Sequence, residues 1–225
     1  RAMVKAKVNA IRLSQGHLTH QQDLDLFHLY QSYIQLAISY TKAQTPMILI
    51  THGLSGCGKS TLSQRLAEEM SIIWIRSDVE RKRLFGLGAL EASHSDIKRG
   101  LYSKTASERT YTRLLDLAKQ ITEAGFTVLV DATFLKTAQR EPFSRLADAL
   151  GLPWHILSLQ ASEDTLRKRI ELRSTQSEDP SEATLEVLNL QLQTREPLVN
   201  KELRHSIQIN TETALPIDSM IKMLK

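Results

Sequence analysis

The residues best suited to chemistry form one short segment, GLSGCGKST at positions 53–61. The segment matches the pattern G-x-x-x-x-G-K-[ST] in full, and it lies between an apolar run and an amphipathic one, the strand-to-helix context that the pattern requires. Its glycines let consecutive backbone N–H groups point inward, and the start of the following helix adds a positive dipole end. The segment therefore predicts a loop that binds nucleotide phosphates.

The positions of this loop have different expected roles. Lys59 would reach the β- and γ-phosphates of ATP, Ser60 would offer its hydroxyl to Mg²⁺, and Thr61 would bond to the α-phosphate. Cys57 is expected to be only a small residue of the loop. The residues expected to bind the nucleotide are Gly53, Leu54, Ser55, Gly56, Cys57, Gly58, Lys59, Ser60 and Thr61.

A carboxylate is expected beside the loop. The apolar run 128–130 ends at Asp131, at the carboxyl end of a predicted strand, where ligands bind in open α/β sheets. We interpret Asp131, with Ser60, as the metal side of the site; the alternative is a strand-end aspartate that caps the next turn. Ala132 follows where many NTP-hydrolysing motors have a glutamate, which favours transfer to another acceptor over hydrolysis.

A second carboxylate, Asp78, follows the apolar run IIWIR at 72–76. In a doubly wound sheet this strand end faces the phosphate loop across the crevice, so Asp78 could accept the proton of an attacking hydroxyl. Arg81 lies one helical turn later on the same face and could contact the acceptor. The alternative is a surface ion pair between Asp78 and Arg81, which would contribute little.

A basic segment, LRKRIELR at 166–173, could form a lid over the triphosphate. Arg169 and Arg173 are four residues apart and share a helix face. Positive charge delivered to the transferring phosphoryl group would stabilise its transition state. A solvated basic helix face is the alternative interpretation.

From residue 46 onward, short β-rich runs alternate with longer helical segments, which is typical of a parallel sheet with crossover helices. Strands are expected at 47–51, 72–76, 127–131, 155–159 and 206–209. Helices are expected at 59–70, about 97–124, 136–150, 163–173 and 181–193, with Asp179, Pro180 and Glu182 starting the last one. Residues 46–225 are thus predicted to form an α/β domain, a three-layer α/β/α P-loop NTPase fold with a parallel sheet of about five strands and a helical lid.

Residues 1–45 differ from the rest of the chain. Two helical segments are separated by Gly16, and the second, 23–40, is apolar on nearly every side. A helix of that kind is normally buried on more than one face. We therefore expect a helical hairpin, docked on the rest of the chain or forming the tail of a preceding domain.

Composition restricts the function further. The net charge is +4 and aromatic residues make up 5% of the chain, which disfavours a nucleic-acid-binding module without excluding a nucleic-acid end as substrate. A single cysteine precludes an internal disulfide and suits a reducing compartment, so the cytoplasm is expected. No apolar run reaches the length of a membrane span, and the scattered histidines show no metal-ligand spacing.

Four segments together carry a resemblance: GLSGCGKST, IRSDVERKRLFG, VDATFLKTAQR and DPSEA. They resemble P-loop kinases of the zeta-toxin and polynucleotide-kinase type, as found in the ATP-binding C-terminal half of bifunctional aminoglycoside-phosphotransferase-like proteins. The resemblance implies Asp78 as general base, Arg81 as an acceptor or phosphate contact, and Asp131 as the metal-side acid. It also implies a lid charge from Arg169 or Arg173. Arg140 lies where that family has an arginine after its DAT motif, and we expect it to contact substrate.

Two functions follow from these residues. The favoured one is a Mg-ATP-dependent phosphotransferase that moves the γ-phosphoryl group to a hydroxyl of an unidentified small molecule or nucleic-acid end. The alternative is a nucleotide-binding regulatory module that controls an attached domain with little or no transfer.

Overall fold

The computed structural model describes residues 1–16, 19–39, 45–88, 104–174, 181 and 183–224. The chain divides into two compact units, Arg1–Gln44 and Thr45–Lys225. Among the helices in this described part, none combines the length and the apolar character needed to cross a bilayer.

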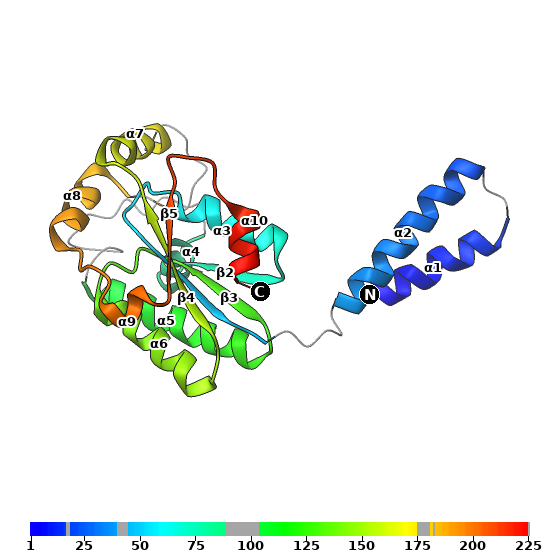
Figure 1. Cartoon of the computed structure of the whole chain (residues 1–225), viewed down its shortest axis with the longest axis horizontal. Coiled ribbons are helices and arrows are strands. Elements are labelled where there is room, and N and C mark those ends of the chain that lie inside the picture. The colour runs from blue at the N-terminus through cyan, green and yellow to red at the C-terminus, as the bar shows by residue number, and fades with distance from the viewer. Residues whose placement is uncertain (17–18, 40–44, 89–103, 175–180, 182, 225) are drawn as a thin grey trace. The chain divides into compact units, whose positions relative to one another are not determined.

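The first unit is a pair of helices, α1 (Ala2–Ser14) and α2 (His20–Ser39), which lie side by side (Figure 1). Ala6 and Asn9 of α1 are buried between them, and the Lys5 ammonium lies 5.3 Å from the centre of the Tyr33 ring. Large apolar side chains remain exposed on both helices of this hairpin. The exposed residues are Met3, Val4, Val8, Ile11, Leu24, Phe27, Leu29, Leu36 and Ile38.

The second unit is built on one parallel sheet. Its strands are β1 (Ile48–His52), β2 (Ile72–Arg76), β3 (Thr127–Asp131), β4 (Trp154–Gln160) and β5 (Ser206–Asn210). Their order is β2-β3-β1-β4-β5, so that β1 lies at the centre and pairs with both β3 and β4. The prediction of a parallel α/β sheet of about five strands is confirmed.

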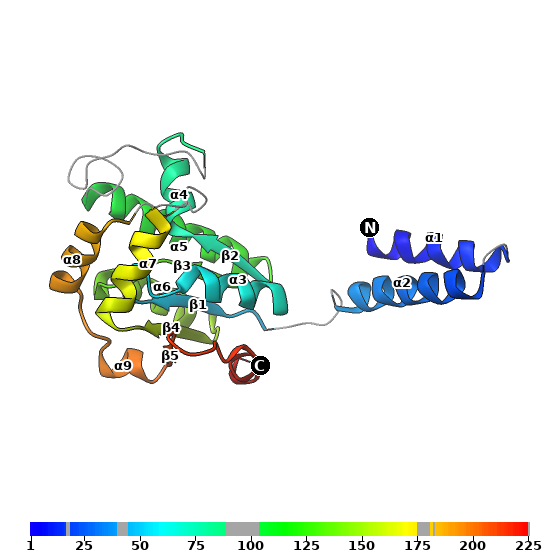
Figure 2. The same ribbon diagram turned by 90° about the horizontal axis from the view of Figure 1, so that it is seen from above.

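Helices cover both faces of this sheet (Figure 2). The helices of the unit are α3 (Lys59–Glu69), α4 (Ser77–Leu84), α5 (Lys104–Glu123), α6 (Thr137–Leu150), α7 (Glu163–Ser174), α8 (Leu185–Thr194), α9 (Asn200–Leu203) and α10 (Ile217–Met223). Alternation along β1 divides the core, because successive side chains of a strand point to opposite faces. Leu49 packs with residues of α3 and α10, whereas Ile48 and Ile50 pack with residues of α5 and α6.

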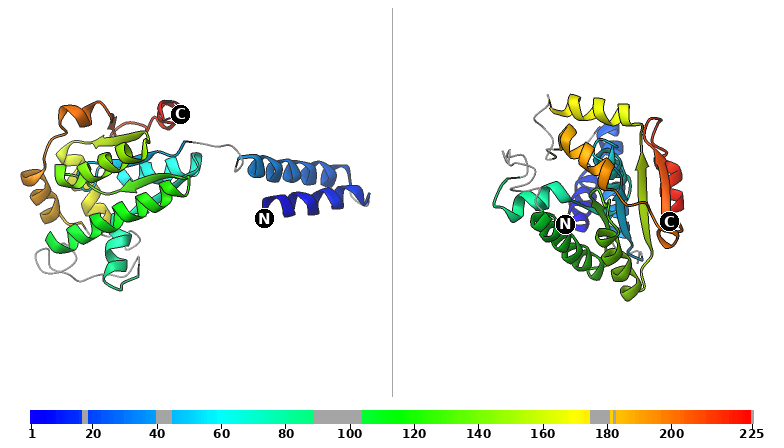
Figure 3. Two further views of the ribbon diagram at one scale, coloured as in Figure 1. Left: turned by 90° about the horizontal axis from the view of Figure 1, so that it is seen from below. Right: turned by 90° about the vertical axis from the view of Figure 1, so that its left-hand side faces the viewer.

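Helices α7 and α8 pack against each other beyond the carboxyl ends of the strands, where β1 passes into the phosphate loop (Figure 3). The predicted start of α8 is wrong. The helix begins at Leu185, and the Thr184 side chain caps it by accepting a hydrogen bond from the Val187 N–H at 3.4 Å. Asp179, Pro180 and Glu182, the expected start, lie outside the described residues, as do positions 97–103 of the helix expected at about 97–124.

Candidate phosphate-binding and transfer site

The phosphate loop depends on backbone conformations that favour glycine. Gly53 has φ +147° and Gly56 has φ +83°. A Cβ at Gly53 would lie 2.6 Å from the Leu159 carbonyl oxygen, and one at Gly56 would lie 2.9 Å from that of Leu166. Any side chain at these positions would therefore push the loop away from β4 and α7.

Lys59, the first residue of α3, folds back over this loop. Its Nζ donates to the carbonyl oxygens of Gly53 at 3.1 Å and Leu54 at 2.8 Å. The ammonium is thus held at the mouth of the loop, where it can reach an anion seated on the loop amides.

A cleft of about 450 Å³ opens above the loop. Three groups of side chains line it: the loop and the start of α3, the carboxyl ends of β2 and β3 with α4 and α5, and the helices α7 and α8. The predicted site residues in its lining are Ser55, Gly56, Gly58, Lys59, Ser60, Thr61, Asp78, Arg81, Asp131, Arg169 and Arg173. Residues far apart in the sequence are thus brought to one cleft.

Asp131 lies at the bottom of this cleft and is 4% exposed. Burial raises the pKa of its carboxyl group, while the charge of Lys59, a hydrogen bond from Ser60 and the charge of Arg76 oppose the shift. The Trp74 indole Nε1 donates to Asp131 Oδ2 at 3.3 Å, and the Arg76 Nε lies 3.9 Å from the same oxygen. Sequence analysis missed Trp74 and Arg76, although their alternate spacing on β2 places them on one face of the strand.

The residues beside Asp131 fit a magnesium ion. The Ser60 hydroxyl and the Asp131 carboxylate are hard oxygen donors within hydrogen-bond contact of each other. In the described residues, no group of three or more His, Cys, Asp or Glu side chains could hold a metal. Mg²⁺ with few protein ligands is usual where nucleotide phosphates supply the others.

Asp78 and Arg81 lie on the first turns of α4 and line the cleft. Their side chains form an ion pair, with Arg81 Nη1 3.4 Å from Asp78 Oδ1, and both keep part of their surface exposed. Asp78 is also close enough to Asp131 for its negative charge to raise the pKa of that carboxyl. The carboxylate expected to act as base thus lies near Asp131.

Further polar groups that line the cleft were not predicted from the sequence. They are Ser107 and Tyr111 of α5, Thr133 after β3, and Lys136 and Gln139 at the start of α6. The Tyr111 hydroxyl accepts the Phe134 N–H at 3.2 Å, and burial raises its pKa. These side chains present hydroxyl, amide and ammonium groups to the cleft.

The two lid arginines have different environments. Arg169 donates from Nη2 to the Thr211 carbonyl at 2.7 Å and from Nη1 to the Thr211 hydroxyl at 3.0 Å and the Gly56 carbonyl at 3.4 Å. Arg173, one turn further along α7, donates to the Ala183 carbonyl at 3.1 Å. Arg169 is therefore fixed between the phosphate loop and the end of β5.

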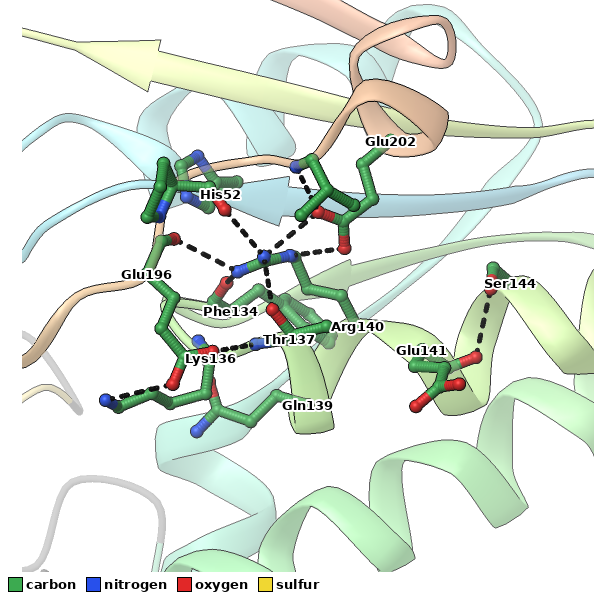
Figure 4. A network of polar contacts seen from close by, with 12 residues as sticks. His52, Phe134, Lys136, Thr137, Gln139, Arg140, Glu141, Ser144, Glu196 and Glu202 are labelled. Atoms are coloured by element: carbon green, nitrogen blue, oxygen red, sulfur yellow. Dashed lines mark hydrogen bonds and ion pairs between the residues drawn. The ribbon is translucent and has the colours of Figure 1, made fainter.

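Arg140 does not lie in the cleft, contrary to the expectation of a substrate contact. Its side chain is fully buried, and its guanidinium bonds to both carboxylate oxygens of Glu202 at 2.7 and 3.0 Å (Figure 4). It also donates to the Phe134 and Pro197 carbonyls at 3.0 and 3.2 Å. These bonds tie the turn after β3 to the segment that follows α8, so Arg140 has a structural position.

Three residues of the predicted nucleotide set also lie elsewhere. Gly53, Leu54 and Cys57 line a second hollow of about 330 Å³, together with His52 and Ser158, and do not appear in the lining of the cleft. Cys57 is 1% exposed and belongs to the apolar core, as expected for a small loop residue. The Leu54 and Cys57 side chains pack into the apolar core instead of the cleft.

Comparison with known proteins agrees with this geometry. The family model described as an AAA domain (AAA_33) matches residues 48–198. The chain belongs to this family. The match covers the phosphate loop, both cleft carboxylates and α7 and α8.

Proteins of known structure share the fold of this AAA domain. A protein from Chloroflexus aurantiacus is 22% identical with a TM-score of 0.62, covering 81% of this chain and 96% of that one. A sugar kinase from Janibacter is 18% identical with a TM-score of 0.56, covering 80% and 92% of the two chains. Chaetomium thermophilum Kti12, solved with ADP-AlF3, is 13% identical with a TM-score of 0.59, covering 79% and 99%. The unit therefore shares its α/β fold with these proteins.

Longer bacterial proteins match as well. Protein Rv2004c of Mycobacterium tuberculosis and protein Mb2027c of Mycobacterium bovis are each 29% identical over 187 residues. The match covers 83% of this chain, and the chain spans 36% of the length of each relative.

Proposed function

We propose that the unit 45–225 is a kinase that transfers the γ-phosphoryl group of Mg-ATP to a hydroxyl of a small molecule or a nucleic-acid end. The observation that carries this proposal is the position of Asp78, which lines the same cleft as the phosphate loop and lies near Asp131. We also propose that this kinase is of the zeta-toxin or polynucleotide-kinase type, which its sequence segments resemble.

The nucleotide is held by the loop and the lid in this proposal. The loop amides and Lys59 bind the β- and γ-phosphates, and Thr61 binds the α-phosphate. When bound beside Ser60 and Asp131, Mg²⁺ neutralises phosphate charge. Arg169 is fixed beside the loop by Thr211 and Gly56, so we assign it to the nucleotide, and we assign Arg173 to the transferring group.

In this proposal the chemical step takes place beside Asp78 and Arg81. The acceptor oxygen bonds to the γ-phosphorus while the bond to the β–γ bridging oxygen breaks, and ADP leaves with that oxygen. The hydroxyl proton passes to the Asp78 carboxylate, and Arg81, paired with Asp78 at 3.4 Å, orients that carboxylate and contacts the acceptor.

Substitution of Asp78 tests the proposal. Asp78→Asn keeps the shape of the side chain and removes the base, so Mg-ATP affinity should stay near that of wild type while transfer falls by about 10²- to 10⁴-fold. The measurement is single-turnover transfer from γ-labelled ATP to sugars, nucleosides, 5′-hydroxyl oligonucleotides and aminoglycosides, beside calorimetric ATP affinity. Arg81→Ala should raise the KM for the acceptor and also slow transfer, because it removes the group that orients Asp78.

Asp116→Asn is the matched control, because Asp116 is exposed on α5 and does not line the cleft. Transfer by Asp78→Asn at the wild-type rate would remove Asp78 from the mechanism. Label that appears only as free phosphate would favour the alternative function, a nucleotide-sensing module that controls an attached domain.

We also propose that the hairpin 1–44 contacts a neighbouring domain in the full-length protein. Its support is the exposed apolar set on α1 and α2, which water solvates poorly. A single buried cysteine suits a cytoplasmic location.

A further inference from the structure

Helix α8 is fastened to the phosphate loop by one side chain that sequence analysis did not single out. The Ser55 N–H donates to Gln191 Oε1 at 2.8 Å, and Gln191 Nε2 donates to the Ser55 hydroxyl oxygen at 3.0 Å. Both residues line the cleft, and Ser55 is 6% exposed. A single amide thus contacts two groups of the same loop residue from 136 positions away.

These two bonds determine where the Ser55 hydroxyl proton can go. A backbone N–H can only donate, so the Gln191 atom facing it is the carbonyl oxygen, and the other atom is the NH₂ group. An NH₂ group can only donate, so the Ser55 oxygen accepts from it. The hydroxyl proton must then donate elsewhere, and within the described residues no hydrogen bond from it is found. The proton is available to a ligand in the cleft.

The position of Ser55 indicates which part of a nucleotide would receive this bond. The Lys59 ammonium contacts the carbonyl of Leu54, the residue before Ser55, at 2.8 Å. That ammonium serves the β- and γ-phosphates, whereas the α-phosphate is expected at Thr61 on the first turn of α3. Ser55 therefore lies at the terminal-phosphate end of the loop.

We propose that the Ser55 hydroxyl donates a hydrogen bond to an oxygen of the terminal phosphate, and that Gln191 is the positioning residue that orients this hydroxyl. The inference rests on the proposed function only in taking the loop as the ATP site. It adds a means of distinguishing ATP from ADP, and it makes that distinction depend on the placement of α8.

The experiment measures nucleotide affinity and needs no acceptor. Calorimetry gives the Kd of ATP and of ADP, with Mg²⁺, for wild type, Ser55→Ala, Gln191→Ala and the double variant. Each single change should weaken ATP about tenfold or more, the effect of losing one hydrogen bond to a charged group, and leave ADP nearly unchanged. The double variant should lose no more than either single variant, because both remove the same bond.

Two further variants sharpen the test. Gln191→Glu can still accept from the Ser55 N–H but offers a second acceptor to the hydroxyl, so it should lose the preference for ATP while the fold is kept. Gln193→Ala is the matched control, since Gln193 is exposed on the same helix and does not line the cleft. It should bind both nucleotides as wild type does, and thermal unfolding of every variant checks the fold.

The outcomes separate this inference from the proposed function. Equal losses of ATP and ADP affinity in Gln191→Ala, additive losses in the double variant, or an unchanged preference in Ser55→Ala would each overturn it. A wild-type protein that prefers ATP through Ser55 and Gln191 but transfers to no acceptor would support the inference while contradicting the kinase proposal.

Discussion

His52 is the residue at which the phosphate loop meets the sheet, and its imidazole is held close to charged groups. Its Nδ1 lies 3.1 Å from the Ser158 hydroxyl oxygen. Burial, followed by the positive charges of Arg140 and Lys59, lowers the pKa of His52 from 6.5 to about 4. The native protein therefore holds this imidazole neutral at a pH where the unfolded chain protonates it.

The free energy of unfolding should fall as the pH drops from about 6.5 to about 4. The pKa of His52 is lower in the folded than in the unfolded state, so protonation in this window favours unfolding, by about 2–3 kcal/mol at its lower end. His52→Gln removes the titration, and denaturant unfolding of both proteins across this window should show a smaller loss in the variant. Because burial also lowers the pKa of His155, the quantity to compare is the difference between the two proteins.

An identical loss in wild type and His52→Gln would contradict the prediction. His20→Gln, at an exposed position of α2, is the control and should follow the wild-type curve.

Single residues were predictable from sequence where ligand geometry constrains their spacing. Lys59 and Ser60 follow the loop glycines at fixed intervals, and Asp131 ends an apolar strand, so each could be placed in the cleft in advance. Arg140 could not, because an arginine in a motif can serve the core as well as a ligand. Its partner Glu202 lies 62 residues away, beyond the reach of any local pattern.

At the scale of helices and strands, apolar patterning located the sheet well and the helix ends poorly. Strands such as 127–131 are buried along their whole length, so their apolar runs are unambiguous. The start of α8 depends instead on which polar residue caps it. The polar stretch before α8 contains two candidate caps, Asp179 followed by Pro180, and Thr184, and the helix begins after Thr184. The Gln191 contact to Ser55 has no sequence pattern at all, because it joins two elements only after folding.

The hairpin of α1 and α2 should be packed against another surface in the full-length protein. Val4 and Phe27 are 64% and 44% exposed, and burying apolar area contributes roughly 25 cal/mol per Å². Amide hydrogen exchange should therefore show protected amides throughout α2. Rapid exchange across that helix would show a loosely attached segment, and Phe27→Glu should accelerate exchange more than a change at the exposed Gln31.

For the whole molecule, nucleotide binding should raise the free energy of unfolding and the Tm. A ligand at about 100 times its Kd stabilises the folded state by about 2.7 kcal/mol. For a protein of this size that corresponds to an increase in Tm of roughly 5–10 °C. Mg-ATP should produce this increase in wild type, and Lys59→Ala should lose most of it, because the ammonium over the loop has no replacement among the loop side chains.

Differential scanning calorimetry with and without Mg-ATP measures the effect. An equal increase in Tm in Lys59→Ala would show that the nucleotide binds away from the loop. Lys168→Ala removes the same charge from the lid helix without touching the lining of the cleft, and it should respond to Mg-ATP as wild type does.

The central position of β1 in the sheet has a consequence for biosynthesis. The neighbours of β1 lie about 80 and 106 residues further along the chain. At about 5–20 residues per second, the ribosome needs roughly 4–16 s to make the segment between β1 and β3, the first partner strand to follow. Until β3 is made, the apolar run Ile48–Ile50, completely buried in the finished protein, has neither of its two partner strands to pair with. The emerging chain is therefore most prone to aggregation while it is being made, and faster translation of this segment would shorten that interval.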